Sequence, residues 1–252
     1  MMLYIGTSGW QYRDWRGHFY PRRIPQREWL AYFASQLCTV EVNNTFYRLP
    51  DRATFESWRG QLPTDFRMAV KMSRYLTHVK RLKEPEEPVE RFLDRAAGLG
   101  SRLGPVLLQL PPNLHAEPTQ LDEVLGLIGN RARVVVEPRH NAWWCDEVRD
   151  VLGKHDAALC WADRRSRTLT PLWATTDFGY LRLHEGRSSR SVAYGQGAID
   201  SWLRRIAEHF DDSHDVYVYF NNDTGGAAVD NALTMIRRAR AAGMSVAGPA
   251  RR

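Results

Sequence analysis

Eight short apolar runs lie along the chain, and most of them end on a polar or charged residue. Near-continuous apolar runs of this length suit strands of a parallel sheet that is covered on both faces. The predicted strands span residues 3–6, 39–43, 66–71, 106–110, 134–137, 158–163, 180–184 and 216–221. Because parallel strands of a barrel gather their carboxyl ends at one face, the polar residues at these ends predict the position of a site.

Helical patterns separate the apolar runs. Trp29, Leu30 and Phe33 share one face of residues 26–36, Asp51 is placed to cap a helix over 51–59, and Pro88 opens 88–99. The remaining predicted helices span residues 117–127, 145–154, 197–210 and 227–242. Strands and helices that alternate eight times predict an α/β fold, a TIM-like (β/α)8 barrel. An open doubly wound sheet is the alternative, but no GxGxxG motif follows the first strand.

The regular alternation is interrupted in the sixth unit. Residues 164–177 contain Pro171 and five Ser or Thr residues without a helical stripe, so an irregular crossover is expected there. Residues 10–25 and 72–87 are predicted to form long loops over the barrel mouth. We expect a single domain over residues 1–242, followed by a tail, 243–252, that is partly disordered.

Composition fits one large core and a reducing compartment. A chain of 252 residues with 43% apolar content is the usual size of one such barrel. The three cysteines form no CxxC pair, which favours free buried thiols and a cytoplasmic location. No signal-like or membrane-spanning segment is expected. The net charge of +6 comes almost wholly from arginine, which suits phosphate-bearing partners but also suits a GC-rich codon usage.

Strand alternation predicts which polar side chains enter the barrel. If Val40 and Val42 face the helices, Glu41 and Asn43 face the barrel axis. The same parity points Lys71, Gln109, Glu137 and Arg182 inward. Two carboxylates then meet two cations, and each would be costly to leave unpaired in the interior.

This inward set has two interpretations. With Asp163 and His184 it forms the floor of an active site, or it is a buried network that only fixes the register of the barrel. We favour the first, because the residues cluster at the carboxyl ends of the strands, where barrel enzymes hold their catalytic groups.

Several motifs carry a family resemblance. They are GTSGW at 6–10, FYP at 19–21, TVEVN at 39–43, FYRLP at 46–50, GPVL at 104–107, QLPP at 109–112, EPRH at 137–140 and YVYFNND at 217–223. Together they resemble the YecE-like family, also called domain of unknown function 72, from residue 3 to about residue 236. The resemblance implies a TIM-barrel-like fold, but no reaction, cofactor or catalytic residue.

Two features near the strand ends bear on chemistry. Residues 222–226 precede the last helix, where backbone amides of barrels often bind phosphate, although the same residue types also make an ordinary polar turn. Glu41, Glu137, Asp163, His184 and Asp223 could hold at most a single divalent metal ion. No nucleotide-cofactor motif is present. His78 and His140, each in a loop, are candidates for acid or base catalysis.

The leading functional interpretation is a hydrolytic enzyme that acts on a phosphorylated or nucleic-acid-derived substrate at the carboxyl-end mouth. Candidate substrate-binding residues are Trp10, Asn43, Gln109, Arg139, His140, Trp143, Asn221, Asn222 and Asp223. One alternative is a glycoside hydrolase that uses Glu41 and Glu137, with tryptophans as sugar platforms. The other is a non-catalytic barrel that binds nucleic acid. A Schiff base on Lys71 is disfavoured, since nearby carboxylates are expected to keep its amine charged.

Overall fold

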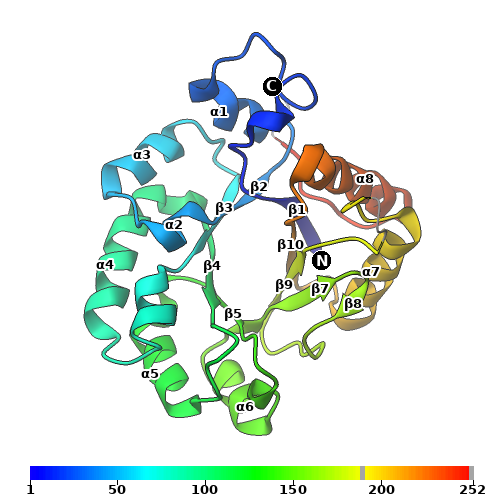
Figure 1. Cartoon of the computed structure of the whole chain (residues 1–252). Helices are drawn as coiled ribbons and strands as arrows, with labels where there is room; N and C mark the ends of the chain where they lie inside the picture. Colours follow the sequence, from blue (N-terminus) through cyan, green and yellow to red (C-terminus); the bar gives the residue numbers. More distant parts are fainter. Residues whose placement is uncertain (188–190, 250–252) are drawn as a thin grey trace.

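The computed structural model describes residues 1–187 and 191–249, in which ten strands form one sheet. The strands are β1 (Met2–Ser8), β2 (Thr39–Val42), β3 (Arg67–Lys71), β4 (Leu103–Gln109), β5 (Val134–Glu137), β6 (Ala158–Leu159), β7 (Trp161–Arg164), β8 (Arg167–Thr168), β9 (Phe178–Leu183) and β10 (Asp215–Phe220). Their order is β6-β5-β4-β3-β2-β1-β10-β9-β7-β8. Figure 1 shows these strands curling around a central axis with the helices outside.

The predicted sixth strand is split into two pieces, and together they close the ring. β6 pairs with β5, while β7, which begins after Cys160, pairs with β9. Every pairing is parallel except the short hairpin of β7 with β8. Eight strand positions therefore surround the axis, and the predicted TIM-like barrel is confirmed. The irregular sixth crossover is also confirmed, because the described residues between β8 and β9 contain no helix.

Eight α-helices alternate with the strands in the described ranges. They are α1 (Trp29–Ala34), α2 (Asn44–Tyr47), α3 (Arg52–Gly60), α4 (Glu86–Ala96), α5 (Pro118–Ile128), α6 (Asp146–Lys154), α7 (Gln196–His209) and α8 (Ala227–Ala241). Asp51 caps α3 as predicted, with its Oδ1 accepting a bond from the Thr54 amide at 2.9 Å. The single-turn α2 was not predicted, because four residues are too few to show a helical stripe.

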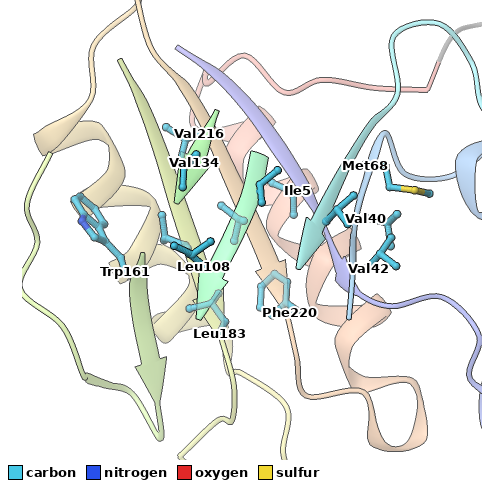
Figure 2. Packing of buried hydrophobic residues seen from close by; sticks show 14 of the residues in the cluster. Ile5, Val40, Val42, Met68, Leu108, Val134, Trp161, Leu183, Val216 and Phe220 are labelled. Carbon is cyan, nitrogen blue, oxygen red and sulfur yellow. The ribbon is translucent and has the colours of Figure 1, made fainter. Parts of the chain in front are cut away.

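Side chains alternate between two layers, as the strand pattern predicts. Ile5, Val40, Val42 and their counterparts on other strands pack in the large core between strands and helices. Figure 2 shows residues of this layer. A separate cluster that includes Ala69, Leu107, Val135, Tyr180 and Tyr219 fills the barrel interior. The interior is therefore packed through its middle, and polar side chains occupy its carboxyl end.

Part of the tail pairs with the first strand. Val246 forms a bridge with Leu3, whose amide and carbonyl bond to Ser245 and Ala247 beside β1. Residues 250–252 lie outside the described part, and partial disorder of the tail stays a prediction. No helix in the described ranges is long and apolar enough to cross a bilayer.

Candidate active site at the carboxyl ends of the strands

Arg182 joins two carboxylates across the inside of the barrel. Its Nη2 donates to Oε1 of Glu41 at 2.9 Å, and its Nη1 donates to Oε2 of Glu137 at 2.7 Å. All three side chains are at most 2% exposed. They come from β9, β2 and β5, which are not neighbours in the sheet, so these bonds must cross the interior. The predicted inward orientation is confirmed for all three residues.

Glu41 is enclosed by further donors. Besides Arg182, its carboxylate accepts bonds from the Tyr180 hydroxyl at 2.6 Å, the Ser8 hydroxyl at 2.8 Å and the Asn43 amide at 3.0 Å. Burial alone would raise the pKa of Glu41, but Arg182 and the two hydroxyls lower it below its usual value. Glu41 is 0% exposed, so it supports the site from beneath without reaching a ligand.

Gln109 links Lys71 to Glu137. Lys71 Nζ donates to Gln109 Oε1 at 2.7 Å, and Gln109 Nε2 donates to Glu137 Oε2 at 2.6 Å. Lys71 Nζ also lies 4.0 Å from the centre of the Phe46 ring. Burial lowers the pKa of Lys71 to about 8, and the charge of Arg182 adds to this effect. The two carboxylates oppose this lowering, and at neutral pH the amine stays mostly charged, as expected.

The depressed pKa of Lys71 should appear as a pH-dependent stability. Between pH 8 and 10.5 the unfolded chain retains a proton that the folded chain has lost, so stability should rise with pH across this window. We expect native protein to gain about 3 kcal/mol relative to Lys71→Met over the window, measured by urea melts. The variant retains every other titrating group and serves as the reference. A difference that stays flat or falls would contradict the assigned environment.

Glu137 is the member of the network that reaches an open cleft. The cleft has a volume of about 840 Å³ and is also lined by Arg139, His140, His184 and Asp223. Glu137 Oε1 lies 3.5 Å from both Arg139 Nη2 and His184 Nε2. Burial would raise the pKa of Glu137, but Arg182 and His184 hold it well below its usual range. An ionised carboxylate therefore forms part of the lining of the cleft.

His184 is oriented by two neighbours. The Asn221 side-chain amide lies 2.9 Å from His184 Nδ1, and Glu137 Oε1 faces Nε2. If the amide donates to Nδ1, the proton of the neutral ring is on Nε2, beside the carboxylate. This arrangement suits a histidine that moves a proton within the cleft.

The turn before α8 is satisfied by the protein itself. The Gly225 amide donates to the Asp14 carboxylate at 2.8 Å, and Trp15 Nε1 donates to the Asp223 carbonyl at 3.1 Å. Of the two interpretations of residues 222–226, the polar turn is the one supported at Gly225, since Asp14 already occupies the amide. Asn222 still lines the cleft, and its buried Oδ1 has no hydrogen-bond partner among the described residues.

Asp163 does not belong to the floor of the site, and its predicted role there is wrong. Its Oδ1 accepts a bond from the Tyr194 hydroxyl at 2.6 Å. Burial raises the pKa of Asp163 in this environment. Trp161, two residues earlier on the same face of β7 as Asp163, packs in the outer core. Ala162, on the opposite face, lines the cleft. Asp163 therefore faces the helices.

Two of the predicted aromatic contacts are also wrong. Trp10 is 3% exposed and packs edge-on against Trp58, with ring centres 5.5 Å apart. Trp143 is fully buried and donates from Nε1 to the Leu114 carbonyl at 2.8 Å. Both rings fill space under the loops. Trp144, the next residue, is the tryptophan that lines the cleft.

The candidate metal ligands are only partly brought together: Glu137, His184 and Asp223 line one cleft, whereas Glu41 and Asp163 do not. Glu41 and Glu137 bond to Arg182, and Asp163 faces the opposite side of the strand. Within residues 1–187 and 191–249 no group of three or more His, Cys, Asp or Glu side chains is arranged to hold a metal ion. The chemistry that this chain's own residues can perform rests on Glu137, His184, Arg139 and Asp223.

Comparison with known proteins identifies the family. The family profile described as "Protein of unknown function DUF72" matches residues 4–252. The chain belongs to the DUF72 family. The resemblance predicted from the motifs is thereby confirmed, and DUF72 carries no assigned reaction.

One relative of this DUF72 chain matches it over nearly its full length, and a solved DUF72 structure shares its fold. It is 24% identical over 268 residues to UPF0759 protein YunF of Bacillus subtilis, covering 93% of this chain and 94% of YunF. It is 33% identical over 110 residues to UPF0759 protein YecE of Escherichia coli, covering 44% of this chain and 38% of YecE. A DUF72 structure from Thermotoga maritima superposes with a TM-score of 0.81 at 28% identity, covering 95% of this chain and 100% of that one.

More distant structures support the fold alone. A DUF72 protein of Enterococcus faecalis gives a TM-score of 0.80 at 18% identity, covering 100% of this chain and 99% of that one. A fusion protein with a xylose isomerase-like TIM barrel gives a TM-score of 0.52 at 13% identity, covering 98% of this chain and 45% of that one.

The structure of this DUF72 protein divides the predicted site residues into two layers. Those that line the cleft are Glu137, Arg139, His140, His184, Asn221, Asn222 and Asp223. Those that lie beneath or beside it are Glu41, Asn43, Lys71, Gln109 and Arg182. His78 packs edge-on against Phe46. Burial lowers its pKa to about 4, with the charge of Lys71 adding to the effect.

Three residues that sequence reasoning missed also belong here. Tyr180 donates to Glu41, and it has the same parity as Arg182, two residues further along β9. Arg164 lines the cleft with the parity of Ala162 and pairs with Glu185 at 3.1 Å. The alternation rule, applied to every strand to its last residue, would have found Tyr180 and Arg164. Glu185 follows the end of β9 and shows no such signal.

Proposed function

We propose that this protein is a hydrolase that cleaves a phosphate ester in the cleft at the carboxyl ends of the strands. The observation that carries the proposal is the environment of Glu137 Oε1. This ionised oxygen faces an open cleft between Arg139 and His184, while the other oxygen of the carboxylate is fixed by Arg182 and Gln109. At this point a buried carboxylate, a half-exposed arginine and an oriented histidine come together. Proton transfer to a leaving group requires such an arrangement of charges and donors.

Arg139 is the group best placed to hold a phosphate. Its side chain is 43% exposed, and its ion pair within the described chain is the loose 3.5 Å contact with Glu137. The guanidinium therefore keeps donors free for a second anion, and its fork matches phosphate oxygens. Arg164 is on the same cleft but is already engaged with Glu185.

His184 and Asp223 are suited to the two proton transfers. His184, oriented by Asn221 and Glu137, can donate a proton to the leaving oxygen as the phosphorus–oxygen bond breaks. Burial raises the pKa of Asp223, which lines the same cleft. A carboxylate with a raised pKa is a better base for the attacking water than an ordinary one.

The geometry gives less support to a glycosidase that uses Glu41 and Glu137. Both carboxylates bond to the same arginine and have lowered pKa values, so neither is placed to act as the required acid. Glu41 is also fully buried.

Substitution of Arg139 by methionine tests the anion site. We expect affinity for phosphorylated ligands to fall about 10- to 100-fold, since a hydrogen bond to a charged group contributes about 1.5–3 kcal/mol. The free energy of unfolding should change by less than about 0.5 kcal/mol, because the side chain is half exposed. Thermal-shift titrations with nucleotides, sugar phosphates, neutral sugars and divalent metals measure both quantities.

Arg237→Met is the matched control, because Arg237 is an exposed arginine on α8 that does not line the cleft. It should leave every thermal shift unchanged. Stabilisation by neutral sugars alone, or phosphate shifts that persist undiminished in Arg139→Met, would contradict the proposed function.

A further inference from the structure

A densely basic loop lies beside the cleft. Residues 11–25, which we name the basic loop, connect β1 to the segment that leads into α1 and contain Arg13, Arg16, Arg22 and Arg23. All four arginines are exposed. The one acidic residue in the loop, Asp14, is bonded to the Gly225 amide. The loop therefore presents a concentrated positive charge.

The basic loop gathers four exposed arginines between residues 13 and 23. Many arginines elsewhere bond to a carboxylate, for example Arg52, Arg91, Arg131, Arg133 and Arg164. None of the four loop arginines has a carboxylate within 4.0 Å among residues 1–187 and 191–249. Their charge is left available to an external anion, and an array of several such charges suits a polyanion.

The basic loop is held in a fixed shape. Trp15 and Tyr20 are fully buried, and Tyr20 stacks on Trp29 with ring centres 4.6 Å apart. Arg16 Nη2 donates to the Arg22 carbonyl at 2.8 Å, which ties the middle of the loop to its later part. Like charges are thus kept near one another by the fold, and a ligand meets them without first ordering a flexible segment.

The basic loop is joined directly to the wall of the cleft. Asp14 and Trp15 bond to the Gly225 amide and the Asp223 carbonyl, in the turn before α8. Asp223 and Thr224 of the same turn line the cleft. A chain that leaves the cleft past this turn therefore meets the basic loop.

We infer that the substrate is a single-stranded nucleic acid, with one nucleotide in the cleft and the adjoining phosphates on the basic loop. The inference rests on the proposed function for the cleft and extends it to the substrate class. A cleft of about 840 Å³ admits one nucleotide-sized group, and Trp144 in its lining offers a stacking face. A base within a duplex is stacked and would first have to be extruded, so the single strand is the form that this geometry accepts directly.

The test compares two triple variants that remove the same charge. Arg13→Met, Arg22→Met and Arg23→Met are combined, which leaves the side-chain bond of Arg16 intact. The control combines Arg204→Met, Arg237→Met and Arg240→Met, which are exposed on α7 and α8. Binding of a fluorescent oligothymidylate is measured by anisotropy from low to high NaCl. Melting temperatures of both variants confirm that each is folded.

The loop variant should bind the oligonucleotide at least about tenfold more weakly at low salt. The slope of log affinity against log salt should fall by about 2, since each lost phosphate contact on a single strand removes about 0.7. The control should bind as the native protein does. No binding by the native protein, an equal loss in the control, or an equally loop-dependent preference for duplex would overturn the inference.

A second readout separates this inference from the proposed function. Turnover of a small phosphodiester should survive in the loop variant and fall in Arg139→Met. Loss of small-ester turnover in the folded loop variant would overturn a separate role for the loop. Loop-dependent oligonucleotide binding by a native protein that hydrolyses no phosphate ester would support the nucleic-acid surface and overturn the proposed hydrolase.

Discussion

Replacement of Arg182 by methionine should destabilise the folded protein by about 3–5 kcal/mol, because removal of the arginine leaves buried carboxylates without their ionic partner. Arg182 bonds to Glu41 and Glu137, and both carboxylates are almost fully buried. Methionine approximates the length of the side chain but supplies neither charge nor donors. Urea melts at neutral pH measure the loss in the free energy of unfolding.

The pH dependence of this loss identifies its cause. Both carboxylates have lowered pKa values in the native protein, so their stabilising contribution is present above about pH 4.5 and is lost as the pH falls through those values. The gap between native protein and Arg182→Met should therefore narrow in acid. Arg133→Met, which breaks partly exposed pairs with Asp177 and Asp215, should cost at most about 1 kcal/mol. An Arg182→Met cost below about 0.5 kcal/mol would mean that the network is solvated.

Replacement of Glu137 by glutamine should lower the turnover number for a phosphate ester by about 10²- to 10³-fold. The amide keeps the shape of the side chain but presents no negative charge beside His184 Nε2. The loss should appear in kcat more than in KM, since Arg139 still holds the phosphate. Steady-state kinetics across pH measure both constants. Unchanged kcat with a raised KM would assign Glu137 to binding only.

Strand parity predicted the buried network because its rule is local. An isolated polar residue in an apolar strand faces whichever side its position dictates, and Glu41, Glu137 and Arg182 follow that rule. The prediction that Asp163 lies in the site rests on its position at the end of a strand. Its parity, however, is that of Trp161, whose side chain faces the helices. Strand alternation, applied to this residue, predicts the helix-facing orientation that the structure shows.

Other features depended on partners that are distant in sequence. Residues 222–226 suit both a phosphate site and a polar turn, and Asp14, 211 residues away from Gly225, decides between them. Burial of Trp10 and Trp143 depends on Trp58 and Leu114, which no local pattern reveals. The bridge of Val246 likewise depends on Leu3 at the other end of the chain.

The most direct test of a catalytic role for Glu137 compares turnover by Glu137→Gln and Glu41→Gln at equal fractions of folded protein. The two carboxylates share Arg182, so both variants weaken the same buried network, but only Glu137 lines the cleft. Glu137→Gln should lose at least about 100-fold in kcat, while Glu41→Gln should stay within about tenfold of the native rate. Equal losses in the two variants would contradict a catalytic role for Glu137 in the cleft and leave the network with a purely structural one.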